Sequence, residues 1–260
     1  MKPNKTLAFL FLCLLFCALA VSCSTTGGAL PKNSELNILF IGNSFTYGNN
    51  LPWLFSNICE DYGYANISVE SVMVGSYTLE MFCDPENKYC KQIDEKFASK
   101  SYDIVILQEQ SSRPILKYDK FREAATTLTE KARANGAEVI LYETWGYAEG
   151  FPDLKTNGWT TAQMAHLLAD AYGRLGEELG VEVVYCGLAM LEMYEKGTDI
   201  PLYHKDLKHP GMGGSYLVAL LFFNHIFHAD VMKVNYKPNA LTQEQADALK
   251  QEVVSFIAGN

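Results

Sequence analysis

The chain has 260 residues, 48% of them hydrophobic and 20% charged, which is long enough to bury a core without a metal or disulfide to hold it together. Its formal net charge is −9, from 21 basic and 30 acidic side chains, and no stripe of Lys and Arg occurs along it. Nucleic acid is therefore an unfavourable partner, because binding a phosphate backbone requires a basic surface.

Residues 1–22 are typical of a signal peptide. Lys2 and Lys5 precede an uninterrupted run of mostly apolar residues over 7–21. As a helix this run spans about 22 Å, which is too short to cross a hydrocarbon core of about 30 Å. We therefore expect a cleaved leader and not a membrane-spanning anchor.

The leader ends in the sequence Ala-Val-Ser-Cys, which resembles the lipobox of bacterial lipoproteins. The resemblance implies that Cys23 is lipidated and becomes the mature N-terminus. Residues 23–34 then form a polar tether, and residues 35–260 form one folded domain. The protein would be held at the bacterial cell envelope, periplasmic or surface-facing, and would touch the membrane only through this lipid. Cleavage at another small residue, with Cys23 an incidental thiol, is the alternative.

Four further cysteines follow Cys23 in the chain. Cys83 and Cys90 are close in sequence around a proline, so a local disulfide is one expectation in the oxidising envelope; four free, buried thiols are the other. The four are Cys59, Cys83, Cys90 and Cys186. No C-x-x-C or H-E-x-x-H pattern occurs, and we expect no metal site.

Five short apolar runs beyond the tether predict buried strands, and longer segments between and after them predict helices. The strands are expected at 36–41, 67–74, 103–107, 138–142 and 181–185. The helices are expected at 51–62, 88–98, 121–134, 161–179, 188–195, 213–228 and 243–257. This alternation indicates βαβ units, and hence a three-layer α/β/α sandwich around a five-stranded parallel sheet of the flavodoxin-like type. Ligands of such folds bind at the carboxyl ends of the strands.

The first strand ends in Gly-Asn-Ser, with Ser44 at the start of a turn. A serine in this place suits a nucleophile, because backbone N–H groups and a helix start converge there. The same tripeptide is also an ordinary turn. The G-x-S-x-G elbow of lipases is absent, since Thr46 stands where its last glycine would be.

Asp206 and His209 lie three residues apart in a predicted turn near the C-terminus. This spacing lets the carboxylate bind the imidazole Nδ1–H and leaves Nε2 facing outward, as a general base requires. A solvated loop carrying both groups is the alternative. His204 is a rival base, but no acidic residue stands three positions before it.

Together, the serine after the first strand and the late Asp-x-x-His pair resemble the SGNH (GDSL-type) hydrolase superfamily over nearly the whole mature chain. The resemblance implies an α/β/α fold and a cofactor-free mechanism. It also implies that Ser44 is the nucleophile, His209 the general base and Asp206 the residue that orients the base.

The resemblance implies an oxyanion hole as well, built from the N–H groups of Ser44 and Gly75 and from an asparagine after the third strand. This chain has no asparagine there but the sequence Gln-Glu-Gln. A glutamine amide is the same donor on a longer arm. We assign the role to Gln110, nearer the carboxyl end of the strand, with Gln108 as the second choice.

Further candidates for substrate binding follow the first, third and fourth strands. Trp145 offers an aromatic platform for a sugar ring and Glu143 an acceptor for hydroxyl groups, unless the tryptophan packs beneath a helix. Asn43 and Gln108 complete the predicted set.

The sequence therefore predicts a serine esterase that hydrolyses carboxylic esters of small molecules or glycans, O-acetyl groups among them. A lipase or thioesterase of the same fold is one alternative. A non-catalytic, carbohydrate-binding envelope lipoprotein is the other, and the missing asparagine keeps it open.

Overall fold

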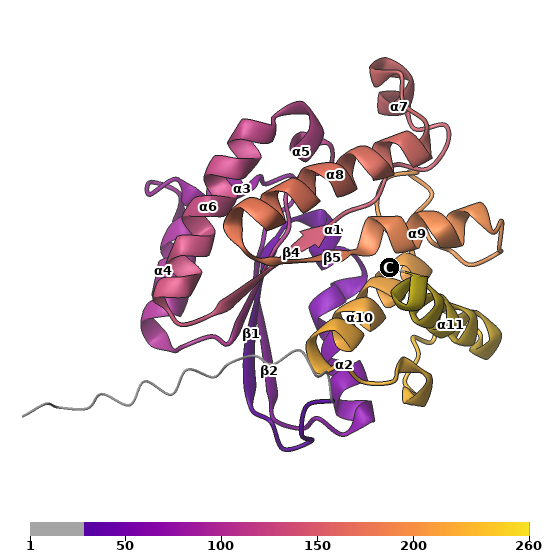
Figure 1. The fold of residues 1–260 in the computed structure, drawn as a ribbon, viewed down its shortest axis with the longest axis horizontal. Helices are drawn as coiled ribbons and strands as arrows, with labels where there is room; N and C mark the ends of the chain where they lie inside the picture. Colours follow the sequence, from indigo (N-terminus) through magenta and orange to yellow (C-terminus); the bar gives the residue numbers. More distant parts are fainter. Residues whose placement is uncertain (1–28, 260) are drawn as a thin grey trace, which may run out of the picture.

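A computed structural model describes residues 29–259 of the chain (Figure 1). The predicted signal peptide, Cys23 and the first part of the predicted tether lie outside the described residues. Within 29–259, no helix combines the length and the apolar character that crossing a membrane would require.

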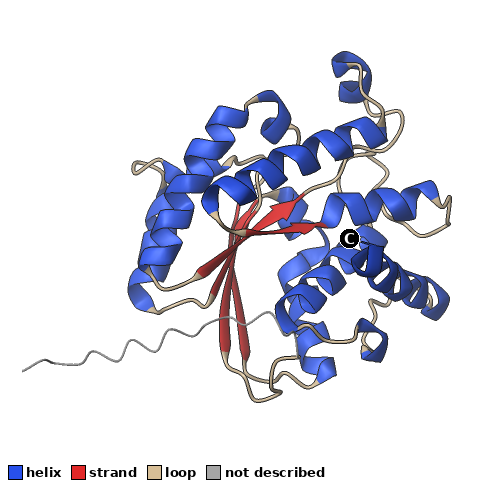
Figure 2. Cartoon of the chain, viewed as in Figure 1, coloured by secondary structure: helices blue, strands red, loops and turns tan. Residues whose placement is uncertain are grey.

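One five-stranded parallel sheet forms the centre of the domain (Figure 2). Its strands are β1 (Leu36–Gly42), β2 (Ile67–Met73), β3 (Ile104–Leu107), β4 (Glu138–Glu143) and β5 (Glu182–Tyr185), in the order β2-β1-β3-β4-β5. This confirms the predicted flavodoxin-like sheet. The chain turns one way from β1 to β2 and the other way to β3, so the crevice for a ligand is expected at the carboxyl ends of β1 and β3.

Eleven α-helices lie around the sheet in the described part of the chain. They are α1 (Ser44–Tyr47), α2 (Leu51–Tyr62), α3 (Leu79–Cys83), α4 (Lys88–Ser99), α5 (Arg113–Leu116), α6 (Tyr118–Ala134), α7 (Pro152–Asn157), α8 (Thr161–Leu179), α9 (Cys186–Glu195), α10 (Met212–Phe227) and α11 (Gln243–Gly259). Every helix expected from the sequence is present, and the additions are short: α1, α3, α5, α7 and two 3₁₀ turns, Gly48–Asn50 and Val231–Lys233.

Helices cover both faces of the sheet, which explains why the strands are continuous apolar runs. Ile38 and Phe40 of β1 belong to a core shared with α2, α9, α10 and α11. The alternate residues Leu39 and Ile41 belong to a second core shared with α3, α6 and the end of α8 (Figure 1). The layers are therefore α/β/α, as predicted.

The described end of the predicted tether is bound to the domain. Leu30 donates its N–H to the carbonyl of Phe227 (3.1 Å), and its own carbonyl accepts the Tyr64 hydroxyl (2.9 Å). The Lys32 ammonium lies 3.3 Å from the centre of the Tyr62 ring, a cation–π contact. These contacts hold residues 30–32 beside the amino ends of the strands.

The four described cysteines are free thiols. Cys83 Sγ donates to the carbonyl of Ala124 (3.5 Å), and Cys90 Sγ accepts from the Lys131 ammonium (3.7 Å). Of the two expectations, the structure therefore has free thiols and not a local disulfide; Cys59, Cys90 and Cys186 are buried, and Cys83 is partly exposed.

Candidate active site

Ser44 is the first residue of α1 and follows directly on the turn that ends β1. Asn43 caps this short helix, because its side-chain Oδ1 accepts the N–H of Phe45 (3.1 Å) and its carbonyl accepts the N–H groups of Thr46 and Tyr47. The cap leaves Ser44 half-buried at the carboxyl end of β1, next to β3.

The three residues predicted as a triad form one continuous chain of contacts. His209 Nε2 lies 2.9 Å from Ser44 Oγ, and His209 Nδ1 lies 2.8 Å from Asp206 Oδ2. The other oxygen of Asp206 accepts the backbone N–H groups of Lys208 (3.0 Å) and His209 (2.9 Å). The acid is thus held by its own turn, and the imidazole faces the serine hydroxyl, an arrangement that favours nucleophilic attack.

Asp206 also contacts a second imidazole, since His204 Nδ1 lies 3.2 Å from Oδ2, the oxygen that His209 contacts. Partial burial opposes ionisation of the carboxyl, but hydrogen bonds from His209, Lys208 and His204 outweigh it and hold the pKa of Asp206 well below its usual range. The carboxyl of Asp206 is therefore ionised at neutral pH.

The loop that carries Asp206 and His209 is fixed by bonds to distant segments. The Trp145 Nε1–H donates to the carbonyl of Lys208 (2.9 Å), and the N–H of Ala148 donates to that of Leu207 (2.9 Å). Phe45, directly after the serine, meets the His209 ring edge-on at 5.6 Å. The imidazole is thus positioned by the segment after β4 and by α1 itself.

Two of the predicted oxyanion donors, Ser44 and Gly75, are backbone N–H groups that follow the adjacent strands β1 and β2. Gly75 lies in the turn after β2, and two hydrogen bonds join this turn to the end of β1. The N–H of Val74 donates to the carbonyl of Gly42 (3.1 Å), and the Asn43 side-chain amide donates to the carbonyl of Tyr77 (2.9 Å). Within residues 29–259, the N–H groups of Ser44 and Gly75 have no hydrogen-bond acceptor. Both are available to a ligand.

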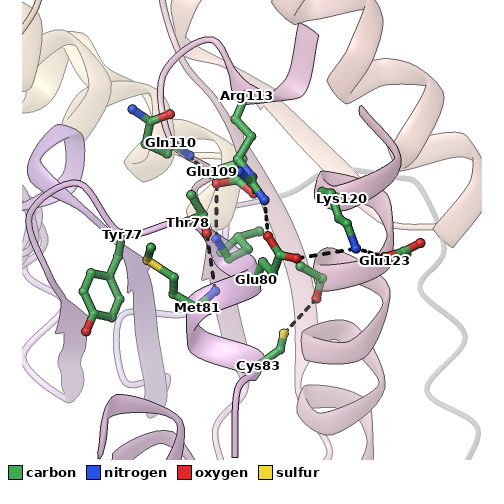
Figure 3. Close-up of polar contacts among 12 residues, drawn as sticks. Tyr77, Thr78, Glu80, Met81, Cys83, Glu109, Gln110, Arg113, Lys120 and Glu123 are labelled. Atoms are coloured by element: carbon green, nitrogen blue, oxygen red, sulfur yellow. Dashed lines mark hydrogen bonds and ion pairs between the residues drawn. The ribbon is translucent and has the colours of Figure 1, made fainter. Parts of the chain in front are cut away.

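The two glutamines after β3 differ sharply. Gln108 is 1% exposed, and its Oε1 accepts the N–H of Asn43 (2.9 Å) and the hydroxyl of Thr46 (2.8 Å), while its amide donates to the carbonyl of Glu109. Gln110 is half-buried, and its side-chain amide has no partner in the described part of the chain. In Figure 3 this amide points away from Glu109 and Arg113. Only Gln110 therefore has a free amide to offer.

These contacts correct the prediction that Asn43 and Gln108 bind substrate. The side chains of both residues are buried and occupied, Asn43 by Phe45 and Tyr77 and Gln108 by the turn after β1. Their part is to build the turn on which Ser44 stands.

The prediction that Glu143 and Trp145 line the cleft is also wrong. Glu143 is 0% exposed and accepts the N–H of Gly187 at the start of α9, and burial raises its pKa well above the usual range. Trp145 is 1% exposed and stacks on Phe45 with ring centres 4.7 Å apart. Trp145 therefore packs in the core and does not offer a platform for a sugar ring.

Backbone strain gathers around the site. Among residues 29–259, six residues other than glycine have a positive φ, and five of them lie in the loops after β1, β2 and β3 or in the loop that carries His209. They are Asn49 (φ 52), Asn50 (φ 54), Ser76 (φ 63), Ser111 (φ 40) and Leu207 (φ 64); the sixth, His228, ends α10. Such conformations cost on the order of 1–3 kcal/mol each and persist where a site requires them.

Within residues 29–259, no group of three or more His, Cys, Asp or Glu side chains is arranged to hold a metal ion.

Solved structures share this architecture. A protein from Slackia heliotrinireducens assigned to the SGNH hydrolases is 24% identical, covers 74% of this chain and 100% of its own, and has a TM-score of 0.65. A DUF4886 family protein from Bacteroides uniformis is 17% identical and covers 86% of this chain and 95% of its own, with a TM-score of 0.70. An acetyl xylan esterase from Geobacillus stearothermophilus is 16% identical and covers 75% and 97%, with a TM-score of 0.55.

No protein-family model and no curated protein matches the sequence. The structural likeness shows that the chain has the α/β/α fold of the SGNH hydrolases, as the motifs implied.

Proposed function

We propose that this protein is a serine ester hydrolase that uses Ser44, His209 and Asp206. The observation that carries the proposal is the unbroken contact from Ser44 Oγ through the His209 ring to Asp206 Oδ2, at 2.9 and 2.8 Å. Ser44 and His209 are separated by 165 positions in sequence, and their contact lies at the carboxyl end of β1, the end of the sheet at which such folds bind ligands.

In the proposed reaction Ser44 Oγ attacks the ester carbonyl while its proton passes to His209 Nε2. The negative charge that develops on the carbonyl oxygen is met by the N–H groups of Ser44 and Gly75 and by the Gln110 amide. The alcohol leaves with the proton from His209. Water then attacks the acyl-enzyme and gives a proton to His209 Nε2, which passes it to Ser44 Oγ as the acid is released.

O-acetyl groups on glycans are the substrate class we propose. Neighbours in structure are named as acetyl xylan esterases, which supports this class by analogy. With Trp145 buried, the aromatic side chain best placed to meet a sugar ring is Tyr47, which is 45% exposed. It lies beside Gly75, where an added Cβ would be 2.9 Å from its hydroxyl.

An active-site fluorophosphonate probe and a small acetyl ester test the proposal together. Ser44→Ala should abolish labelling and reduce hydrolysis by ~10³-fold or more in a folded protein. Ser215→Ala is the matched control, because Ser215 also lies close to the turn after β1 but is buried and bonded to Asn49 (2.9 Å). No labelling of the folded protein would favour the non-catalytic binding protein instead.

The base is tested by a second matched pair. His209→Ala should cost ~10³-fold or more, whereas His204→Ala should cost far less, since His204 contacts Asp206 but not Ser44. Retention of more than a tenth of the activity in purified His209→Ala would reject this base and make His204 the next candidate.

We further propose that the protein is a lipoprotein anchored at Cys23. Residues 30–32, near the start of the described chain, bind beside the amino ends of the strands, at the opposite end of the sheet from Ser44. Labelling of cells with a clickable fatty acid should mark the full-length protein and not Cys23→Ser; equal labelling of the two would exclude the anchor.

A further inference from the structure

A fully buried carboxylate stands at the end of β3, next to the free amide of Gln110. Glu109 is 0% exposed, and its Oε1 accepts two backbone N–H groups, from Gln110 at 2.6 Å and from Leu79 at 3.2 Å (Figure 3). Neither the sequence motifs nor the proposed reaction assigns this side chain a role.

The two N–H groups belong to the two loops that carry predicted oxyanion donors. Leu79 begins α3, four residues after Gly75, and Gln110 bears the free amide. Each donor is followed by a strained residue, Ser76 (φ 63) after the glycine and Ser111 (φ 40) after the glutamine. One oxygen atom therefore holds together two loops whose backbones are under strain.

The other oxygen of Glu109 has no hydrogen-bond partner in the described part of the chain. The closest cation is Arg113, whose Nε lies 3.9 Å away and whose guanidinium pairs instead with Glu80. The titratable and charged groups around Glu109 are Glu80 and Cys83 from α3, Arg113 from α5, Tyr172 from α8, and Lys120 from α6, which pairs with Glu80.

These surroundings bring the pKa of the Glu109 carboxyl close to neutral pH. Burial raises the pKa of Glu109, while the N–H groups of Gln110 and Leu79 and the charge of Arg113 oppose the rise, so the pKa lies at about 7. An ionised carboxylate binds N–H groups about twice as strongly as a neutral acceptor does. The contact between the loops is therefore tight above that pH and looser below it.

We propose that Glu109 is a positioning residue which, as a carboxylate, holds the Gly75 and Gln110 loops in the arrangement that receives the oxyanion. This role rests on the proposed ester hydrolysis and adds to it a second group that must be deprotonated. Glu109 touches no reacting atom; it acts through the N–H of Gln110 and the start of α3.

Glu109→Gln tests the role, because the amide keeps the size and one acceptor but stays neutral. We expect kcat to fall about tenfold, with KM unchanged within about twofold. In the wild type, kcat should fall at low pH more steeply than a single protonation allows over about one pH unit around the pKa of Glu109, because protonation of Glu109 adds a fall of about tenfold to that of the base. The variant should show a slope of one.

Glu143→Gln is the matched control. Glu143 is also 0% exposed and also accepts a backbone N–H, but that N–H belongs to Gly187 at the start of α9 and to neither loop. It should keep the wild-type kcat and slope. A purely structural role for Glu109 would give the two variants the same profile.

Arg113→Met gives a second route that leaves the carboxyl in place. Removing this cation should raise the pKa of Glu109 and move the acid limb of the profile to higher pH, with the plateau unchanged. The proposal would be overturned if the acid limb of the Arg113→Met profile did not move. It would also be overturned if folded Glu109→Gln kept the wild-type kcat and the wild-type slope at low pH.

The amide resonances of Leu79 and Gln110 separate this proposal from the proposed function. In wild-type protein both should titrate with one midpoint near neutral pH, and in Glu109→Gln neither should. If they titrate but no Ser44-dependent hydrolysis exists, the bridge between the loops stands and its catalytic role is overturned with the function. If hydrolysis depends on Ser44 and the amides do not titrate, the proposal for Glu109 fails alone.

Discussion

Neighbouring strands β3 and β4 each end beside a fully buried glutamate, but the residues that follow differ in their exposure to solvent. Glu109 after β3 joins two loops, and the next residue, Gln110, remains half-exposed with a free amide. Glu143 at the end of β4 binds the start of α9, and all residues from 144 to 148 are buried after it. Both strands point toward the same edge of the sheet, but Gln110 after β3 is partly exposed beside the end of β1, whereas the residues after β4 are buried.

The reason lies in what covers each end. Trp145 is enclosed by Phe45 and by the carbonyl of Lys208 in the loop of the base. At Gly187 in α9 an added Cβ would lie 2.2 Å from the carbonyl of Thr144, so helix and strand end are in direct contact. The closed end of β4 thus supports the loop of His209, and the end of β3 leaves the amide of Gln110 free.

Of the substitutions that distinguish the end of β3 from the end of β4, we expect the largest effect on kcat at Gln110. Gln110→Ala should lower kcat by ~10²–10³ at nearly constant KM, since losing one oxyanion donor typically costs about 2.7–4 kcal/mol of transition-state binding. The melting temperature should stay unchanged, because the amide has no protein partner to lose. Steady-state kinetics on a small acetyl ester and a thermal melt measure both.

Gln108→Ala is the informative comparison. It removes the buried acceptor of the Asn43 N–H and the Thr46 hydroxyl, and should destabilise the fold by about 2–3 kcal/mol. If Gln108→Ala lost kcat at full stability while Gln110→Ala kept it, the donor would have been assigned to the wrong glutamine.

The pH dependence of stability should distinguish the two glutamates next. A carboxyl whose pKa is raised by folding stabilises the protein below its unfolded pKa, and the stabilisation is lost as pH rises toward the folded pKa. With a folded pKa of about 7 against 4.5, the stability of the wild type relative to Glu109→Gln should fall by roughly 2–3 kcal/mol from about pH 5 to about pH 8 and then level off.

Relative to Glu143→Gln, the wild type should continue to lose stability above that range, since burial raises the pKa of Glu143 further. Urea unfolding across pH measures both differences. Identical curves for the two variants would remove the electrostatic distinction between the ends of β3 and β4.

The smallest effect is expected at Trp145. Trp145→Phe keeps an aromatic ring against Phe45 but removes the bond to the carbonyl of Lys208, and should cost about 1–2 kcal/mol of stability. Activity should fall only a few-fold, because the Asp206 turn still orients the imidazole. A loss as large as that of His209→Ala would mean that this indole contacts substrate after all.

The sequence by itself determined the strands and the long helices, because apolar runs and helical periodicity are local properties. The helices 51–62 and 161–179 have the same bounds in the sequence analysis and in the structure. The short helices α3, α5 and α7 were missed, since four to six residues cannot display a period. The Asp206–His209 contact was also predictable, as its partners lie within one turn of chain.

Only the tertiary structure decided which polar and aromatic residues at the strand ends face the crevice. Gln108 and Gln110 have the same chemistry two positions apart, but the turn after β1, more than 60 residues away, occupies the first and leaves the second free. Trp145 is buried by Phe45 and by a loop 63 positions further on. Exposure is set by whatever packs against a side chain, and those partners come from elements whose distance no local pattern encodes.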